Sequence, residues 1–185
     1  MNKTAILFFA PGTEEIEALT PCDLLRRVNV NVIVCGASDS TTIIGSHNIK
    51  VECDTTENEI DKNVDFDMVI IPGGLRGSDC LSKSKIVNHF LSRAINEHKF
   101  IASICASPGV VLGQKGILKG KKATCYPGFE EKMIGAEYVN EKVVVDDNII
   151  TSKGAGTAVE FSLELVRVLF DEETKRNLAN KILWG

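Results

Sequence analysis

Cys105 is the residue of this sequence best placed to act as a nucleophile. It follows a short apolar run, residues 100–104, which is typical of a buried strand in a parallel sheet. Pro108 and the apolar residues after it predict that a helix begins just beyond the cysteine, because the first turn of a helix accepts proline. A sulfur at such a turn lies near unpaired N–H groups and the positive end of the helix dipole, which favour the thiolate. The alternative is that Cys105 is a small buried hydrophobic residue, the commoner role of a free cysteine.

Glu17 is the candidate partner of this cysteine. A helix is predicted from Glu14 to about Val28, because a turn precedes it and glutamates occupy its first turn. The residues expected on the same face as Glu17 are Pro21, Leu24 and Val28. Ile16, Leu19 and Leu25 also require burial, which makes this apolar stripe broad. The pattern therefore places a carboxyl group in an apolar surface, and the alternative is that Glu17 is a solvated acid.

Glycine-rich loops follow two further predicted strands. The first contains Pro72, Gly73 and Gly74, and the second contains Lys153, Gly154, Ala155 and Gly156. Glycines at the end of a strand allow a close approach of the backbone to a ligand, although most such pairs only form a turn. The second loop precedes a helix that we expect to open with a capping box of Thr157 and Glu160. Such a loop can hold phosphate, but it lacks the Walker ending and the full G-x-G-x-x-G spacing, so nucleotide binding is the weaker interpretation.

Strand and helix patterns alternate along most of the chain. Strands are predicted at residues 4–9, 30–35, 65–71, 100–104, 123–126, 143–145 and 148–152, and helices at 14–28, 84–98, after 105, 157–170 and 172–183. Residues 42–53 are predicted to form an antiparallel hairpin, with His47 exposed near its turn. This order predicts an α/β fold with a mostly parallel sheet and helices on both faces. Ligands of such folds bind at the carboxyl ends of the strands, where the loops toward Glu17, Gly74 and Cys105 would meet.

The composition narrows the class of protein. The chain has 185 residues, 44% apolar and 25% charged, which predicts one domain covering residues 1–185. A net charge of −4 without a block of lysine and arginine argues against nucleic-acid and membrane-surface partners. The apolar run at residues 5–10 is too short for a signal peptide or a membrane span, so we expect a cytosolic protein. The six cysteines form no C-x-x-C pair, which predicts free thiols and no metal site.

Three motifs then carry a resemblance to a known family. They are P-G-T-E-E-I-E at residues 11–17, I-P-G-G at 71–74 and A-S-I-C-A-S-P-G at 102–109. With D-L-L-R-R at 23–27 and S-K-G-A-G-T-A-V-E-F at 152–161, their order and spacing resemble the ThiJ/PfpI superfamily over nearly the full chain. The likeness is greatest to the subgroup that contains the parkinsonism-associated protein deglycase and bacterial YajL.

The resemblance implies a flavodoxin-like sandwich, a homodimer and a set of site residues. Cys105 matches the nucleophilic cysteine, Glu17 its partner, and the backbone N–H groups of Gly74 and Ala106 an oxyanion pocket. The residues expected to line the pocket are Gly73, Tyr126, Gly154 and Ala155. Tyr126 stands where relatives often have histidine, and a tyrosine donates a hydrogen bond but does not titrate near pH 7.

The expected chemistry needs neither a metal nor an organic cofactor. Burial should keep Glu17 protonated, so that it donates to the sulfur while N–H groups stabilise the thiolate. Such a thiolate would attack a 2-oxoaldehyde such as methylglyoxal, or act on early aldehyde adducts of proteins, as in glyoxalase and deglycase reactions. The alternative is a redox sensor or oxidation-activated chaperone that uses the same cysteine. Peptidase activity is disfavoured, because Ala106 stands where peptidase-like relatives carry histidine.

Overall fold

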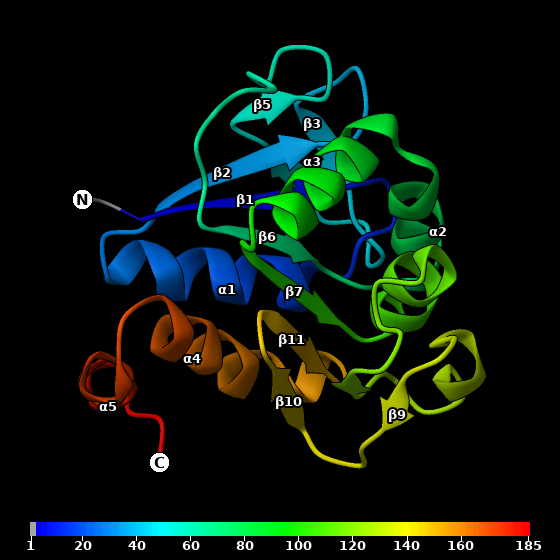
Figure 1. Ribbon diagram of the computed structural model, residues 1–185. Helices are drawn as coiled ribbons and strands as arrows, with labels where there is room; N and C mark the ends of the chain where they lie inside the picture. Colours follow the sequence, from blue (N-terminus) through cyan, green and yellow to red (C-terminus); the bar gives the residue numbers. More distant parts are fainter. Residues whose placement is uncertain (1–2) are drawn as a thin grey trace.

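A seven-stranded sheet forms the centre of the computed structural model, which describes residues 3–185 (Figure 1). Residues 1 and 2 of the expected domain lie outside this part. The sheet consists of β1 (Thr4–Phe9), β2 (Asn31–Gly36), β5 (Thr55–Thr56), β6 (Met68–Ile71), β7 (Phe100–Ile104), β10 (Val143–Asp146) and β11 (Ile149–Ser152). Their order is β10-β11-β7-β6-β1-β2-β5, and all neighbours are parallel except β10 and β11. The predicted mostly parallel sheet is therefore confirmed.

Helices cover both faces of this sheet (Figure 1). They are α1 (Glu15–Arg27), α2 (Leu75–Lys83), α3 (Lys85–Asn96), α4 (Ala158–Leu169) and α5 (Glu172–Lys181). Leu7 of β1 faces the core under α1 and α4, whereas its neighbour Phe8 faces the core under α3. Both side chains are almost fully buried, because successive residues of a strand point to opposite faces. The central strands are therefore apolar throughout, as the sequence indicated. No helix within residues 3–185 is long and apolar enough to cross a membrane.

Two small sheets lie outside the central one. The predicted hairpin is formed by β3 (Thr42–Ile44) and β4 (Lys50–Glu52), which pair antiparallel. The other small sheet pairs β8 (Lys122–Ala123) with β9 (Glu137–Tyr138) in parallel. The predicted strand at residues 123–126 is therefore wrong for its last three residues. One reason is that the N–H of Thr124 donates to the hydroxyl of Thr151, and that of Tyr126 to the carbonyl of Cys105.

Several predicted elements differ in type or extent. The helix after Cys105 is a π-helix (Pro108–Leu112) followed by a 3-10 turn (Gly113–Lys115), because the N–H of Gly113 bonds to the carbonyl of Pro108. Helix α2 was missed, since its buried face consists of Gly77, Ser78 and Leu81 and has little apolar periodicity. The predicted strand at residues 65–71 begins only at Met68.

The predicted burial of two side chains and one predicted helix cap are also wrong. Ile16 and Leu19 are 54% and 40% exposed, because α1 is covered on one side only. The capping box of Thr157 and Glu160 does not form. The hydroxyl of Thr157 turns back to the carbonyl of Gly154, at 2.8 Å, and Glu160 pairs with Lys142.

Candidate functional site

Cys105 lies where β7 ends, at the carboxyl edge of the sheet, and its backbone is held in an unusual conformation. Its φ is +68°, in the left-handed region that costs a non-glycine residue about 1–2 kcal/mol. Its N–H donates to the carbonyl of Ser152 at 2.9 Å, and its carbonyl accepts from the N–H of Tyr126 at 2.8 Å. These bonds fix the turn on both sides and leave the cysteine half-buried.

Glu17 is brought to this cysteine by the first turn of α1. It is 1% exposed, and its Oε2 accepts the N–H of Gly73 at 2.9 Å. The N–H of Ala155 and the thiol of Cys105 lie beside this carboxyl group, and both favour its charged form. A Cβ on Gly73 would lie 2.4 Å from Oε2 of Glu17 and 2.5 Å from Cβ of Cys105. Only glycine therefore fits at position 73, where the two side chains meet.

Two backbone N–H groups, one from each flanking loop, lie close enough to the sulfur to influence its ionisation. They belong to Gly74 and Ala106, and both favour the charged form of the thiol. Gly74 has a φ of +84°, and a Cβ there would lie 2.4 Å from the carbonyl oxygen of Gly12. Ala106 is 3% exposed. The pair forms the arrangement of an oxyanion pocket around Cys105.

Tyr126, Gly154 and Ala155 form the edge of the same site. A Cβ on Gly154 would lie 3.2 Å from the ring of Tyr126 and 3.8 Å from Oε1 of Glu17. The ring of Tyr126 is half exposed and makes an edge-on contact with Phe129, at 6.4 Å between centroids. The structure thus brings all eight predicted site residues together, although they come from helix α1 and four separate loops.

The ionisation of Glu17 and Cys105 is coupled. Burial raises the pKa of Glu17 to about 7, although hydrogen bonds from Cys105 and Gly73 oppose the shift. Burial and the negative charge of an ionised Glu17 raise the pKa of the Cys105 thiol to about 12. That charge disappears once Glu17 takes a proton. The lowered thiol pKa expected from the sequence therefore requires a protonated Glu17 and does not arise beside an ionised one.

Ser107 is a buried residue of the site that the sequence reasoning missed. Its hydroxyl donates to the carbonyl of Pro72 at 2.6 Å and bonds to the hydroxyl of Ser78 at 2.8 Å. It thus ties the turn after Cys105 to the loop that supplies Gly73 and Gly74. The available signal was its position between the cysteine and Pro108, since a polar residue buried there needs a partner.

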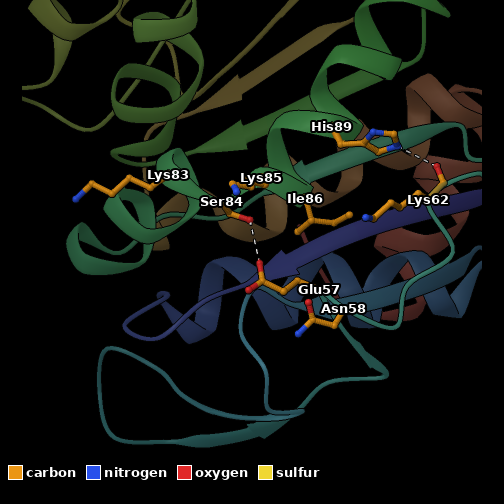
Figure 2. Close-up of a pocket in the computed structure, with 8 residues that line it drawn as sticks. All are labelled: Glu57, Asn58, Lys62, Lys83, Ser84, Lys85, Ile86 and His89. Atoms are coloured by element: carbon orange, nitrogen blue, oxygen red, sulfur yellow. Dashed lines mark hydrogen bonds between the residues drawn. The ribbon is translucent and has the colours of Figure 1, made fainter.

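The surface pocket shown in Figure 2 is separate from this site. It has a volume of about 430 Å³ and is lined by Glu57, Asn58, Lys62, Lys83, Ser84, Lys85, Ile86 and His89. Ser84 caps α3 by accepting the N–H of Val87, and its hydroxyl donates to Glu57 at 3.4 Å. None of the lining residues is a cysteine, so this pocket offers no thiol nucleophile.

Comparison with known proteins places the chain in a family. Residues 3–168 match the model of the DJ-1/PfpI family. Protein dj-1beta of Drosophila melanogaster is 36% identical over 185 residues, which cover 99% of this chain and 98% of that protein. The structure of oxidized Toxoplasma gondii DJ-1 superposes with a TM-score of 0.95 at 33% identity, over 99% of both chains. The chain therefore belongs to the DJ-1/PfpI family and has the flavodoxin-like fold that the resemblance implied.

Three further relatives bear on function and on length. Glutathione-independent glyoxalase DJR-1.2 of Caenorhabditis elegans is 33% identical over 180 residues, covering 96% of this chain and 94% of that protein. Two Arabidopsis thaliana relatives, Protein DJ-1 homologs B and A, are 35% and 36% identical. The chain spans only 40% and 47% of their respective lengths.

Proposed function

We propose that this protein is a cofactor-independent enzyme of the glyoxalase or deglycase type. Its substrates would be 2-oxoaldehydes such as methylglyoxal, or their early adducts on proteins. The observation that carries the proposal is the meeting of Cys105 and Glu17 across Gly73, with the N–H groups of Gly74 and Ala106 beside the sulfur. A relative named as a glutathione-independent glyoxalase adds support.

The first step is the attack of the Cys105 thiolate on the aldehyde carbon of the substrate. A carbon–sulfur bond forms, and the aldehyde oxygen gains the negative charge. N–H groups that already point toward this region stabilise such a charge without reorganisation. Those of Gly74 and Ala106 lie beside the sulfur, and therefore beside the carbon that it would attack. The oxygen then takes the proton that Glu17 carries, which gives a neutral hemithioacetal and leaves Glu17 as a carboxylate.

Glu17 next moves a proton between the two carbons of the adduct. It removes the hydrogen from the carbon bound to sulfur and returns a proton to the neighbouring carbon. The hydroxyl proton of the hemithioacetal passes to the ketone oxygen, so that the former ketone becomes an alcohol and the carbon bound to sulfur becomes a carbonyl. The product is a thioester of lactate, and water cleaves it to lactate and free thiol. The net reaction is methylglyoxal plus water to lactate, which needs no external oxidant. A carboxyl group with a pKa of about 7 suits both transfers at neutral pH.

Redox sensing is the second candidate function. Cys105 is half-buried rather than sealed, and two N–H donors at its sulfur would stabilise a sulfinate as well as a thiolate. All six cysteines are free, as expected for a reducing compartment such as the cytosol. An oxidation-activated chaperone would use the same residue. Nucleic acid and membranes are not among the partners that we propose.

A homodimer is part of the proposal. Ile16 on α1 and Ile44 and Ile49 on the hairpin are about half exposed. The hairpin is joined to the turn that precedes α1 by the bond from the N–H of Gly12 to the carbonyl of Ile44, at 2.9 Å. These side chains therefore offer apolar surface on neighbouring elements, which favours association with a second copy. Sedimentation should give twice the mass of the chain, and Ile49→Glu should shift the protein toward a monomer.

Lactate formation is the experiment that tests the activity. The purified protein should convert methylglyoxal to lactate without glutathione or added metal, and Cys105→Ser should abolish the conversion. Protein that makes no lactate but gains two oxygens on Cys105 at low peroxide concentration would favour the sensor. Cys35→Ser is the matched control, because this buried thiol lies outside the site.

A further inference from the structure

Glu14, Glu15 and His47 form a compact group outside the Cys105 site. The glutamates lie at the start of α1, and His47 lies in the turn between β3 and β4. One ligand atom from each residue, two carboxylate oxygens and Nδ1 of the imidazole, lies within 4.8 Å of the others. His47 is exposed as the sequence predicted, with 69% of its side chain accessible, but it is not a free loop residue.

The spacing of these atoms suits a metal ion. Nδ1 of His47 lies 3.1 Å from Oε2 of Glu15 and 3.4 Å from Oε1 of Glu14. Tetrahedral zinc binds nitrogen and oxygen at roughly 2.0–2.2 Å, which places its ligand atoms about 3.3–3.6 Å from one another. The two measured separations are therefore close to those of a metal site.

The carboxyl group of Glu15 is already oriented for such a role. The backbone N–H of His47 donates to its Oε1 at 2.8 Å, which leaves Oε2 turned toward Nδ1. Hydrogen bonds of this kind fix metal-binding carboxylates in position. Glu15 is only 4% exposed, so its direction does not depend on solvent.

Negative charge and hydrogen-bond acceptors exceed the positive charge and donors available to this group. Among the ion pairs of residues 3–185, His47 is the only cation paired with either glutamate. The hydroxyl of Ser46 lies 2.9 Å from Glu14, 3.0 Å from Glu15 and 2.9 Å from Nδ1 of His47, yet it has one proton to donate. Besides the backbone N–H groups at Glu15, two carboxylates thus share one serine proton and one imidazole, and one of the two carboxylates is buried. This imbalance is independent of the spacing and also points to a bound cation.

We infer that Glu14, Glu15 and His47 form a binding site for one divalent transition-metal ion of the zinc type. One imidazole nitrogen and two carboxylate oxygens are ligands that zinc prefers, whereas calcium and magnesium favour oxygen alone. Water would occupy the fourth position. The ion takes the place of the proton on Nδ1, so that each ion bound to a protonated His47 releases one proton.

This site does not use the residues of the proposed reaction. The side chain of Glu17 bonds to Gly73, whereas those of Glu14 and Glu15 face Ser46 and His47. Cys105 and Glu17 could bind zinc as well, since thiolate and carboxylate are also ligands. A test must therefore separate the two locations.

Titration with cobalt(II) and zinc, in Cys105→Ser protein without a histidine tag, provides this separation. We expect one ion per chain and a cobalt spectrum that lacks a sulfur charge-transfer band. His47→Gln should weaken binding roughly tenfold or more, because an exposed ligand is lost without disturbing the core. Glu15→Gln should act similarly. His98→Gln is the matched control, since His98 is exposed and distant in sequence from the group, and it should bind as the parent does.

The pH dependence of binding provides a second readout. The ionisable groups recorded in contact with His47 are Glu14 and Glu15, and both favour its protonated form. Binding should therefore strengthen as pH rises and His47 loses its proton, and proton release should fall over the same range. Binding by His47→Gln as tight as that of the parent would overturn the inference, as would the absence of binding at millimolar metal.

Discussion

Glu15 and Glu17 lie two residues apart on α1, and both are almost fully buried, yet their pKa values shift in opposite directions. Glu15 is 4% exposed and Glu17 is 1% exposed. The pKa of Glu15 falls to about 2, whereas that of Glu17 rises to about 7. Burial alone raises both, so the difference must come from the groups that each carboxyl meets.

Their partners explain the difference. For Glu15, burial is outweighed by the N–H and imidazole of His47 and the hydroxyl of Ser46, all of which bond to the charged form. For Glu17, burial raises the pKa by more than the thiol of Cys105 and the N–H of Gly73 lower it. The nearby charge of Glu14 raises the pKa further. Adjacent positions of one helix thus provide a permanent anion and a group that can carry a proton at neutral pH.

The largest effect that we expect is a difference in kcat between variants of the two glutamates. Glu17→Gln should lower kcat for lactate formation about 10³-fold, because the amide cannot move the proton between the two carbons. Glu15→Gln should lower it less than tenfold, since this carboxyl does not touch the sulfur. Steady-state kinetics with methylglyoxal measures both. Equal losses in the two variants would show that the contrast has no catalytic meaning.

The absence of a side chain at Gly73 allows Glu17 and Cys105 to approach each other. A methyl group at this position should push them apart. Gly73→Ala places a Cβ against both Glu17 and Cys105, so we expect a loss in kcat of about 100-fold. Gly156→Ala is the matched control, because a Cβ at Gly156 meets nothing within 4 Å. Similar kinetics for the two variants would contradict the close approach at Gly73.

The two glutamates should give opposite slopes of stability against pH. Glu15 has a lowered pKa, so its contribution is present above about pH 4.5 and is lost as pH falls toward 2. Glu17 has a raised pKa, so stability is lost as pH rises from about 4.5 to 7. Each effect should be on the order of 2 kcal/mol.

Denaturant unfolding between pH 2 and 8 measures these slopes. Cys105→Ser protein serves as the parent, so that the thiol does not titrate. Glu15→Gln should flatten the curve at low pH, and Glu17→Gln should flatten it between pH 4.5 and 7. Flattening of the same region by both variants would remove the contrast.

Substitution of Tyr126 should have the smallest effect on activity. Its ring is half exposed, and Glu17 already supplies the proton transfers of the proposed reaction. Tyr126→Phe should therefore change kcat/KM for methylglyoxal less than about threefold and leave the pH profile in place. A pH profile that shifts in this variant would assign the tyrosine a proton-transfer role.

The sequence predicted Glu17 better than Glu15 because the two depend on different kinds of information. Glu17 interrupts an apolar stripe and matches a motif, so its local pattern indicates burial. Glu15 depends on His47, which the hairpin brings from 32 residues away, and no local pattern encodes that contact. The central strands were predicted because their residues are apolar on both faces, whereas α2 buries small and polar residues and was missed.

The protonation of the Cys105 and Glu17 pair is the central claim, and the thiolate absorbance near 240 nm tests it most directly. The measurement is the difference between the unmodified protein and Cys105→Ser as pH is raised. We predict a thiolate at Cys105 already at pH 7, below the ordinary thiol pKa of about 8.5, with the proton on Glu17. A Cys105 that shows no thiolate until pH exceeds 9 would contradict the account.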